Sequence, residues 1–104
     1  MFYLFDQNNS GGSFRRPAMC VFIEADNADE ANDLAHEHGI YFEGCYSGSD
    51  CPCCGDRWYR ADDDEGTETP QIYGKHPKDH KFYGRSGVRK YIIVYKDGKV
   101  EGEV

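Results

Sequence analysis

The stretch MCVFIEADNADEANDLAHEHG, residues 19–39, decides the fold. Its first part, residues 19–25, is apolar at neighbouring positions, which is typical of a strand covered on both faces. Asn27 then offers a side-chain oxygen to a helix start, and Glu30 follows three residues later, as in a capping box. Apolar residues recur at helical spacing up to Gly39, a natural helix end. We therefore expect a strand followed directly by a helix.

On the N-terminal side, residues 2–5 (FYLF) predict a first strand. It is also apolar on both faces, so we expect it at a central position in the sheet. The polar segment 6–14 separates it from the strand at 19–25. A hairpin of these two strands is expected, with the polar segment at its tip.

On the C-terminal side, residues 90–95 (KYIIVY) are β-branched and aromatic and predict the clearest strand. Asp97-Gly98 predicts a type I′ turn, and residues 99–104 return as a charged edge strand. Residues 57–60 (RWYR) predict one more strand. The expected fold class is α+β, with one helix packed on a small antiparallel sheet in the order β-β-α-β-β-β.

The chain has 104 residues, enough for a single domain spanning 1–104. Within it, residues 62–88 are rich in Gly, Pro and charged side chains, so we expect an irregular, partly mobile loop region. A domain this small buries little core and gains stability from contacts between copies. We therefore expect a homo-oligomer.

The charge balance limits the partners. Twelve Lys and Arg stand against 19 Asp and Glu, for a net charge of −7, which argues against duplex DNA. Residues 75–90 are locally basic, however, which is typical of a solvated loop; the alternative interpretation is that they face a small anion. No secretory signal is visible and no apolar run approaches the ~20 residues that span a bilayer. We expect no membrane partner and a cytoplasmic location.

Three cysteines cluster in CPCCG, residues 51–55. Cys51 and Cys54 have the spacing with which two thiolates bind one zinc ion, and Cys45 is a candidate third ligand. No second C-x-x-C occurs in the chain. Three interpretations stay open: a structural zinc site, thiols packed in a tight loop, and a thiol redox pair.

Two motifs carry the side chains expected to bind a ligand. The amide-rich segment after residue 6 offers donors and acceptors to polar edges, and its glycines allow backbone N–H groups to face an anion. In the second motif, an Arg beside aromatic rings is a common arrangement for phosphate and base. We expect the two motifs to meet and to form one cleft. The predicted ligand contacts are Gln7, Asn8, Asn9, Ser10, Gly11, Phe14, Arg15, Asp56, Arg57 and Trp58. No catalytic residue is predicted, because no nucleophile elbow or marked nucleophile–base pair is present.

The same two motifs, FDQNNSGGSF at residues 5–14 and CPCCGDRW at residues 51–58, resemble those of a family of small, uncharacterised proteins of tailed bacteriophages. The resemblance covers the first half of the chain and a little more, and segment 62–88 is shorter than in that family. It implies a protein made inside an infected bacterium. Many accessory phage proteins bind host factors or capture nucleotide immune signals.

Two functional hypotheses follow. The first is a phage accessory protein that binds a small anionic, nucleotide-derived ligand and so counters host defence without catalysis. The alternative is a zinc-stabilised interaction module that inhibits a host protein.

Overall fold

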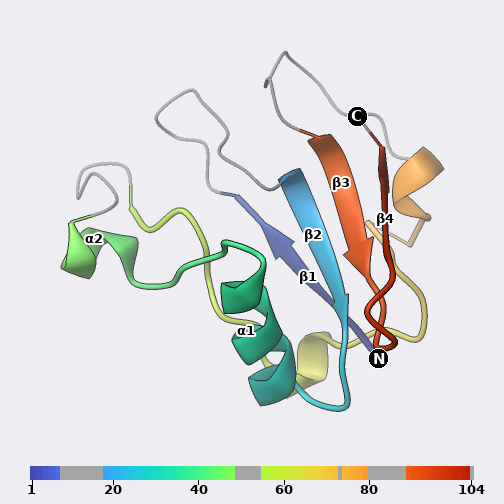
Figure 1. Cartoon of the computed structure of the whole chain (residues 1–104), viewed down its shortest axis with the longest axis horizontal. Helices are drawn as coiled ribbons and strands as arrows, with labels where there is room; N and C mark the ends of the chain where they lie inside the picture. Colours follow the sequence, from blue (N-terminus) through green and yellow to red (C-terminus); the bar gives the residue numbers. More distant parts are fainter. Residues whose placement is uncertain (8–17, 49–54, 73, 80–88, 104) are drawn as a thin grey trace.

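The protein is built on one four-stranded sheet with the strand order β1-β2-β3-β4 (Figure 1). The computed structural model describes residues 1–7, 18–48, 55–72, 74–79 and 89–103. The strands are β1 (Phe2–Asp6), β2 (Ala18–Glu24), β3 (Arg89–Val94) and β4 (Val100–Glu103). With the helix α1 (Ala28–Glu37) following β2, this architecture confirms the α+β class.

The sheet is mixed, which corrects the expected all-antiparallel arrangement. β1 pairs antiparallel with β2, and β3 pairs antiparallel with β4. The central pair, β2 and β3, is parallel, with Phe22 opposite Ile93. The chain between them includes α1 and returns to the end of the sheet where β2 began. A crossover of this kind, in contrast to a hairpin, makes two neighbouring strands parallel.

β1 lies at an edge of the sheet, where the sequence predicted a central strand. β1 is apolar on both faces because both faces of the sheet are covered, even at this edge. The helix-side cluster covers one face of β1, and a second cluster containing Phe2 covers the other. The outer backbone groups of Phe2 exchange two hydrogen bonds with Thr67, at 2.6 and 2.9 Å.

α1 begins as predicted. The Asn27 side chain accepts a hydrogen bond from the Glu30 N–H at 2.8 Å. Asp63, in the short 3-10 turn η1 (Asp63–Glu65), accepts a second one from the Ala28 N–H at 2.8 Å. The helix ends before Gly39, whose φ of 88° is readily adopted only by glycine. Its alanines are buried and let the helix pack closely on the sheet.

Residues 57–60 do not form the predicted strand, and none of the four described strands pairs with them. Two short helical turns, α2 (Gly44–Ser47) and η2 (Pro77–Asp79), complete the described elements. The predicted type I′ turn is also wrong: in the β3–β4 connection only Gly98 has a positive φ, 93°. The Gly98 N–H donates to the Tyr95 carbonyl at 2.9 Å, as in a three-residue hairpin loop.

The core therefore has two layers. On the helix side, α1 and the segment around Trp58 pack on the sheet, and a smaller layer around Ile72 packs on the opposite face. Among the described residues, no helix is long and apolar enough to cross a membrane. The helix-side cluster comprises Tyr3, Phe5, Ala18, Val21, Ile23, Ala25, Ala28, Ala31, Ala35, Ile40, Phe42, Trp58, Ala61, Ile92 and Val94.

Candidate functional site

Gln7 connects the two sequence motifs. It follows β1 directly and is only 9% exposed. Its Nε2 donates to the Ala18 carbonyl at 2.6 Å, which joins the two ends of segment 8–17. Its Oε1 accepts a hydrogen bond from Nη1 of Arg57 at 3.0 Å. The described part of the amide-rich motif therefore meets the described part of the cysteine motif, at one end of the sheet.

The same end of the sheet carries a second cation. The Gln7 N–H donates to the Met19 carbonyl at 3.4 Å, so Gln7 extends the β1–β2 ladder by one position. Because Ala18 pairs with Arg89 in the β2–β3 register, Lys90 is the neighbour of Met19 on β3. Gln7, Met19 and Lys90 therefore lie side by side at neighbouring register positions at this end of the sheet. We call these three residues the terminal row.

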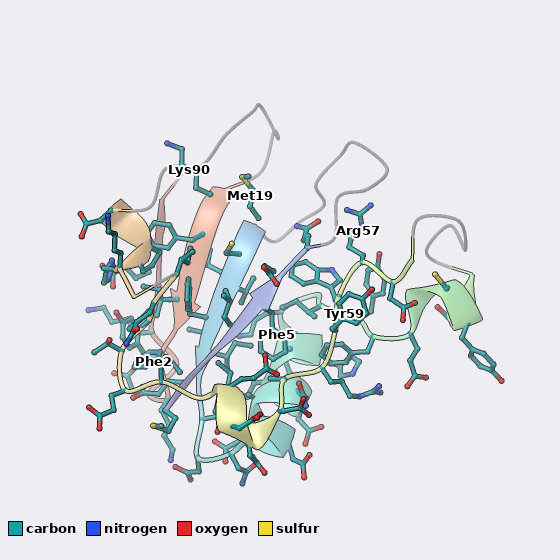
Figure 2. The ribbon with its side chains drawn as sticks, turned by 180° about the vertical axis from the view of Figure 1, so that it is seen from behind. Phe2, Phe5, Met19, Arg57, Tyr59 and Lys90 are labelled. Atoms are coloured by element: carbon teal, nitrogen blue, oxygen red, sulfur yellow. The ribbon has the colours of Figure 1, made fainter. Side chains whose placement is uncertain are left out.

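Basic side chains stand at both ends of the terminal row: Lys90 is its last member, and Arg57 is bonded to Gln7 at the other end. Figure 2 shows Lys90, Met19 and Arg57 toward the same end of the molecule, with Phe2 toward the other. Neighbouring strands lie about 4.8 Å apart, so the backbones of Gln7 and Lys90 are about 10 Å apart. Lys90 is exposed and Arg57 is half-buried. An anion bound along this row would meet positive charge on both sides.

The backbone that carries Arg57 is held firmly. Trp58, the next residue, is 1% exposed and belongs to the helix-side core cluster. The Ala61 N–H donates to the Asn32 side chain at 2.8 Å, and that side chain donates back to the Ala61 carbonyl at 3.2 Å. Both bonds are buried and attach this segment to α1. With its backbone anchored and its side chain bonded to Gln7, Arg57 loses little conformational entropy when it binds an anion.

The position of Trp58 changes its expected role. The sequence predicted Trp58 as a ligand contact, but its ring is packed inside the core, as its 1% exposure shows. Its Nε1 is buried, and no described residue accepts a hydrogen bond from it. The adjacent ring of Tyr59 is instead 59% exposed. Within the described part of this segment, Tyr59 is the exposed ring near Arg57.

Asp56 connects the cysteine motif to α2. Its Oδ1 accepts a hydrogen bond from the Cys45 N–H at 2.9 Å, so the two ends of segment 45–56 lie close together. Glu43 precedes α2, and its φ of 57° is unusual for a residue other than glycine. Glu43 also pairs with Arg60 at 2.6 Å.

The structure leaves most of the other predicted contacts undescribed. Among the parts of the chain that it does describe, no group of three or more potential metal ligands comes together. Cys45, the one predicted zinc ligand within those parts, is half-buried. The predicted site residues outside the described ranges are Asn8, Asn9, Ser10, Gly11, Phe14, Arg15, Cys51 and Cys54.

The other described cysteine lies on the opposite face of the sheet. Cys20 is the register partner of Asp6, and burial, followed by the nearby Asp6 charge, raises the pKa of its thiol to about 12. The thiol therefore stays protonated at neutral pH and is a poor nucleophile. It takes no part in the terminal row.

Sequence reasoning missed the position of Lys90 beside Met19. It appeared only as the last member of a basic stretch, because its place beside Met19 depends on the parallel register of β2 and β3. The available signal was its position at the start of the strongest strand pattern, where a charged residue can still reach solvent.

A family model described as "Domain of unknown function (DUF7296)" matches residues 1–103. No curated protein and no solved structure matches the chain.

Proposed function

The chain belongs to this DUF7296 family, and we propose that it binds a small, phosphate-bearing, nucleotide-like anion at the terminal row without catalysing a reaction. The observation that carries this proposal is the hydrogen bond from Arg57 to Gln7. It holds a guanidinium beside the end of a sheet whose third strand contributes the exposed Lys90.

The chemistry of both cations supports a phosphate. A guanidinium has five N–H donors in a fixed plane, and Gln7 orients that plane through one of them. Planar donors match phosphate oxygens in a two-pronged contact, while a lysine ammonium contributes a mobile point charge. Because the whole chain carries a net charge of −7, a local pair of cations offsets the general repulsion of an anion.

The proposed biological setting comes from the resemblance to tailed-bacteriophage proteins. A non-catalytic binder of nucleotide-like anions, made in the cytoplasm of an infected bacterium, would lower the concentration of a host immune signal. Binding at this end of the sheet is also compatible with a homo-oligomer, which we include in the proposal.

Isothermal titration calorimetry of the full chain tests the proposal. The probes are inorganic pyrophosphate, ADP and a cyclic dinucleotide, at protein concentrations of about 100 μM. We expect at least one probe to bind. Arg57→Gln should weaken that binding about tenfold or more, since a hydrogen bond to a charged group contributes about 1.5–3 kcal/mol. Absence of binding by every probe would refute the proposal.

Two further variants separate binding from folding. Arg60→Gln is the matched control, because Arg60 lies on the same segment but pairs with Glu43, away from Gln7. Lys90→Gln changes an exposed side chain and leaves the core intact. We expect Lys90→Gln to weaken binding and Arg60→Gln to leave it unchanged, with equal melting temperatures. Equal loss of affinity in Arg60→Gln would contradict the assigned site.

One observation favours the second candidate, a zinc-stabilised interaction module. The bond between Asp56 and Cys45 brings together the ends of the segment that contains the other clustered cysteines. In this proposal Cys45, Cys51 and Cys54 hold one zinc ion that stabilises a surface binding a host protein. Elemental analysis should find about one zinc per chain, retained in Cys20→Ser and lost in Cys45→Ser. Zinc-free protein with an unchanged melting temperature would exclude it.

A further inference from the structure

Tyr59 presents an aromatic ring to solvent two residues after Arg57, and we propose that it is the surface on which the base of a nucleotide stacks. This inference depends on the anion site proposed above and specifies the other half of the ligand. The phosphate lies at Arg57, and a nucleobase lies on Tyr59. The ligand is therefore a nucleotide, as opposed to a free phosphate or pyrophosphate.

The arrangement of the segment supports this placement. Successive Cα atoms are 3.8 Å apart, so the Cα atoms of Arg57 and Tyr59 are at most about 7 Å apart. Trp58, between them, points into the core, while Tyr59 is 59% exposed. Figure 2 shows Tyr59 on the same segment as Arg57, farther from the end of the sheet. A 5′-nucleotide has a similar spacing, because one sugar separates its base from its phosphate.

Tyr59 is also presented by fixed backbone. On one side it follows the buried Trp58, and on the other the buried hydrogen bonds between Ala61 and Asn32 hold the chain to α1. A large ring exposed on an otherwise anchored segment costs little entropy when it is covered by a ligand. Base–aromatic stacking is tolerant of base identity, because every base has a π face.

The second exposed tyrosine provides a matched control. Tyr46 is 94% exposed on α2, which projects away from the sheet in Figure 1. It lies outside both motifs and far from Arg57 along the chain. Loss of its ring should leave nucleotide binding unchanged if Tyr59 carries the base.

The test compares ADP with inorganic pyrophosphate by calorimetry on the full chain. Stacking contributes about 1–3 kcal/mol per base, so we expect ADP to bind about tenfold or more tightly than pyrophosphate. Tyr59→Ser should abolish that difference without changing pyrophosphate affinity, Tyr59→Phe should retain it, and Tyr46→Ser should leave it intact.

The outcomes separate this inference from the function on which it depends. If pyrophosphate binds as tightly as ADP, the anion site stands and the role of Tyr59 is refuted. If Tyr59→Ser weakens ADP and pyrophosphate equally, or if Tyr59→Phe also loses the preference, the ring does not stack on the base and the inference fails. If neither probe binds and the cyclic dinucleotide is also silent, the proposed function itself fails.

Discussion

At the scale of single residues, Gln7 shows how one neutral side chain can organise a charged end of a sheet. An amide both donates and accepts, so Gln7 can bond the Ala18 carbonyl and orient Arg57 at the same time. A carboxylate at this position could accept from Arg57 but could not donate to Ala18. The sequence pointed to Gln7 as a ligand contact, whereas the structure gives its side chain two protein partners.

Replacing Gln7 by methionine tests that role. The Gln7→Met variant keeps the side-chain size but leaves the buried Ala18 carbonyl without its donor, so we expect a loss of about 1–3 kcal/mol in the free energy of unfolding. Gln71→Met is the matched control, because Gln71 bonds the Thr69 hydroxyl at an exposed site and should change stability by less than about 0.5 kcal/mol. Urea denaturation measures both, and equal losses would show that Gln7 holds nothing in place.

The Cys20 thiol gives a second prediction at this scale. Its pKa is raised to about 12, first by burial and then by Asp6, so the reactive thiolate forms only as the pH rises toward that value. In native protein at pH 8, iodoacetamide should therefore alkylate Cys20 much more slowly than after unfolding. Asp6→Asn should lower the pKa only in part, because burial is the larger cause. Peptide mass spectrometry of timed samples measures the rates, and labelling as fast as in the unfolded chain would disprove the shift.

At the scale of elements, the acidic segment after residue 61 is more than a solvated loop. Asp63 accepts a hydrogen bond from the first turn of α1, and Asp62 and Glu65 cap their own short turn. Negative charge is favourable at a helix N-terminus, where N–H groups lack helical partners. The acid run therefore joins η1 to α1.

Variants at the start of α1 test this joint. Asn27→Ala removes the acceptor for the Glu30 N–H, and Asp63→Ala removes the acceptor for Ala28. We expect each to cost about 1 kcal/mol of stability. Asp64→Ala removes an exposed acid from the same turn and should cost less than about 0.5 kcal/mol. Thermal melts followed by circular dichroism measure the three variants. An equal loss of stability in Asp64→Ala and Asp63→Ala would mean that the negative charge of η1, and not the hydrogen bond from Ala28, stabilises the helix start.

The elements also show what local sequence can and cannot predict. β1, β2, β3 and α1 were expected because each has a strong local pattern, and Asn27 was correctly assigned as the cap. Residues 57–60 have the same alternation as a strand, but whether a partner strand lies beside them is a tertiary property. For the same reason, the burial of Trp58 could not be distinguished from exposure for stacking.

At the scale of the whole molecule, one indole reports on the assembly of the helix-side layer. Trp58 packs in a cluster that joins the sheet, α1 and the segment around Ala61. Its exposure of 1% predicts weak quenching by acrylamide in the native state. If the domain unfolds as one unit, tryptophan fluorescence and far-ultraviolet circular dichroism should give the same urea midpoint. A fluorescence midpoint at lower urea would mean that the segment around Trp58 detaches from the sheet before α1 unfolds.

The global arrangement explains why only part of the candidate site was predictable. That the two motifs meet was expected, and their described ends do so through Gln7 and Arg57. The contribution of Lys90 follows from the parallel pairing of β2 and β3, which local patterns did not reveal. Strand direction depends on the path of the long connection, and local periodicity carries no information on that path.

The parallel pair at the centre of the sheet has a consequence for how the protein is made. β2 ends at Glu24, but its partner begins only at Arg89, near the end of the chain. During translation, the β1–β2 hairpin can emerge from the ribosome early, but it must wait for nearly all of the remaining residues before its inner edge is paired. Until then the inner edge of β2 keeps its backbone hydrogen-bonding groups unpaired, which exposes the nascent chain to mispairing and aggregation.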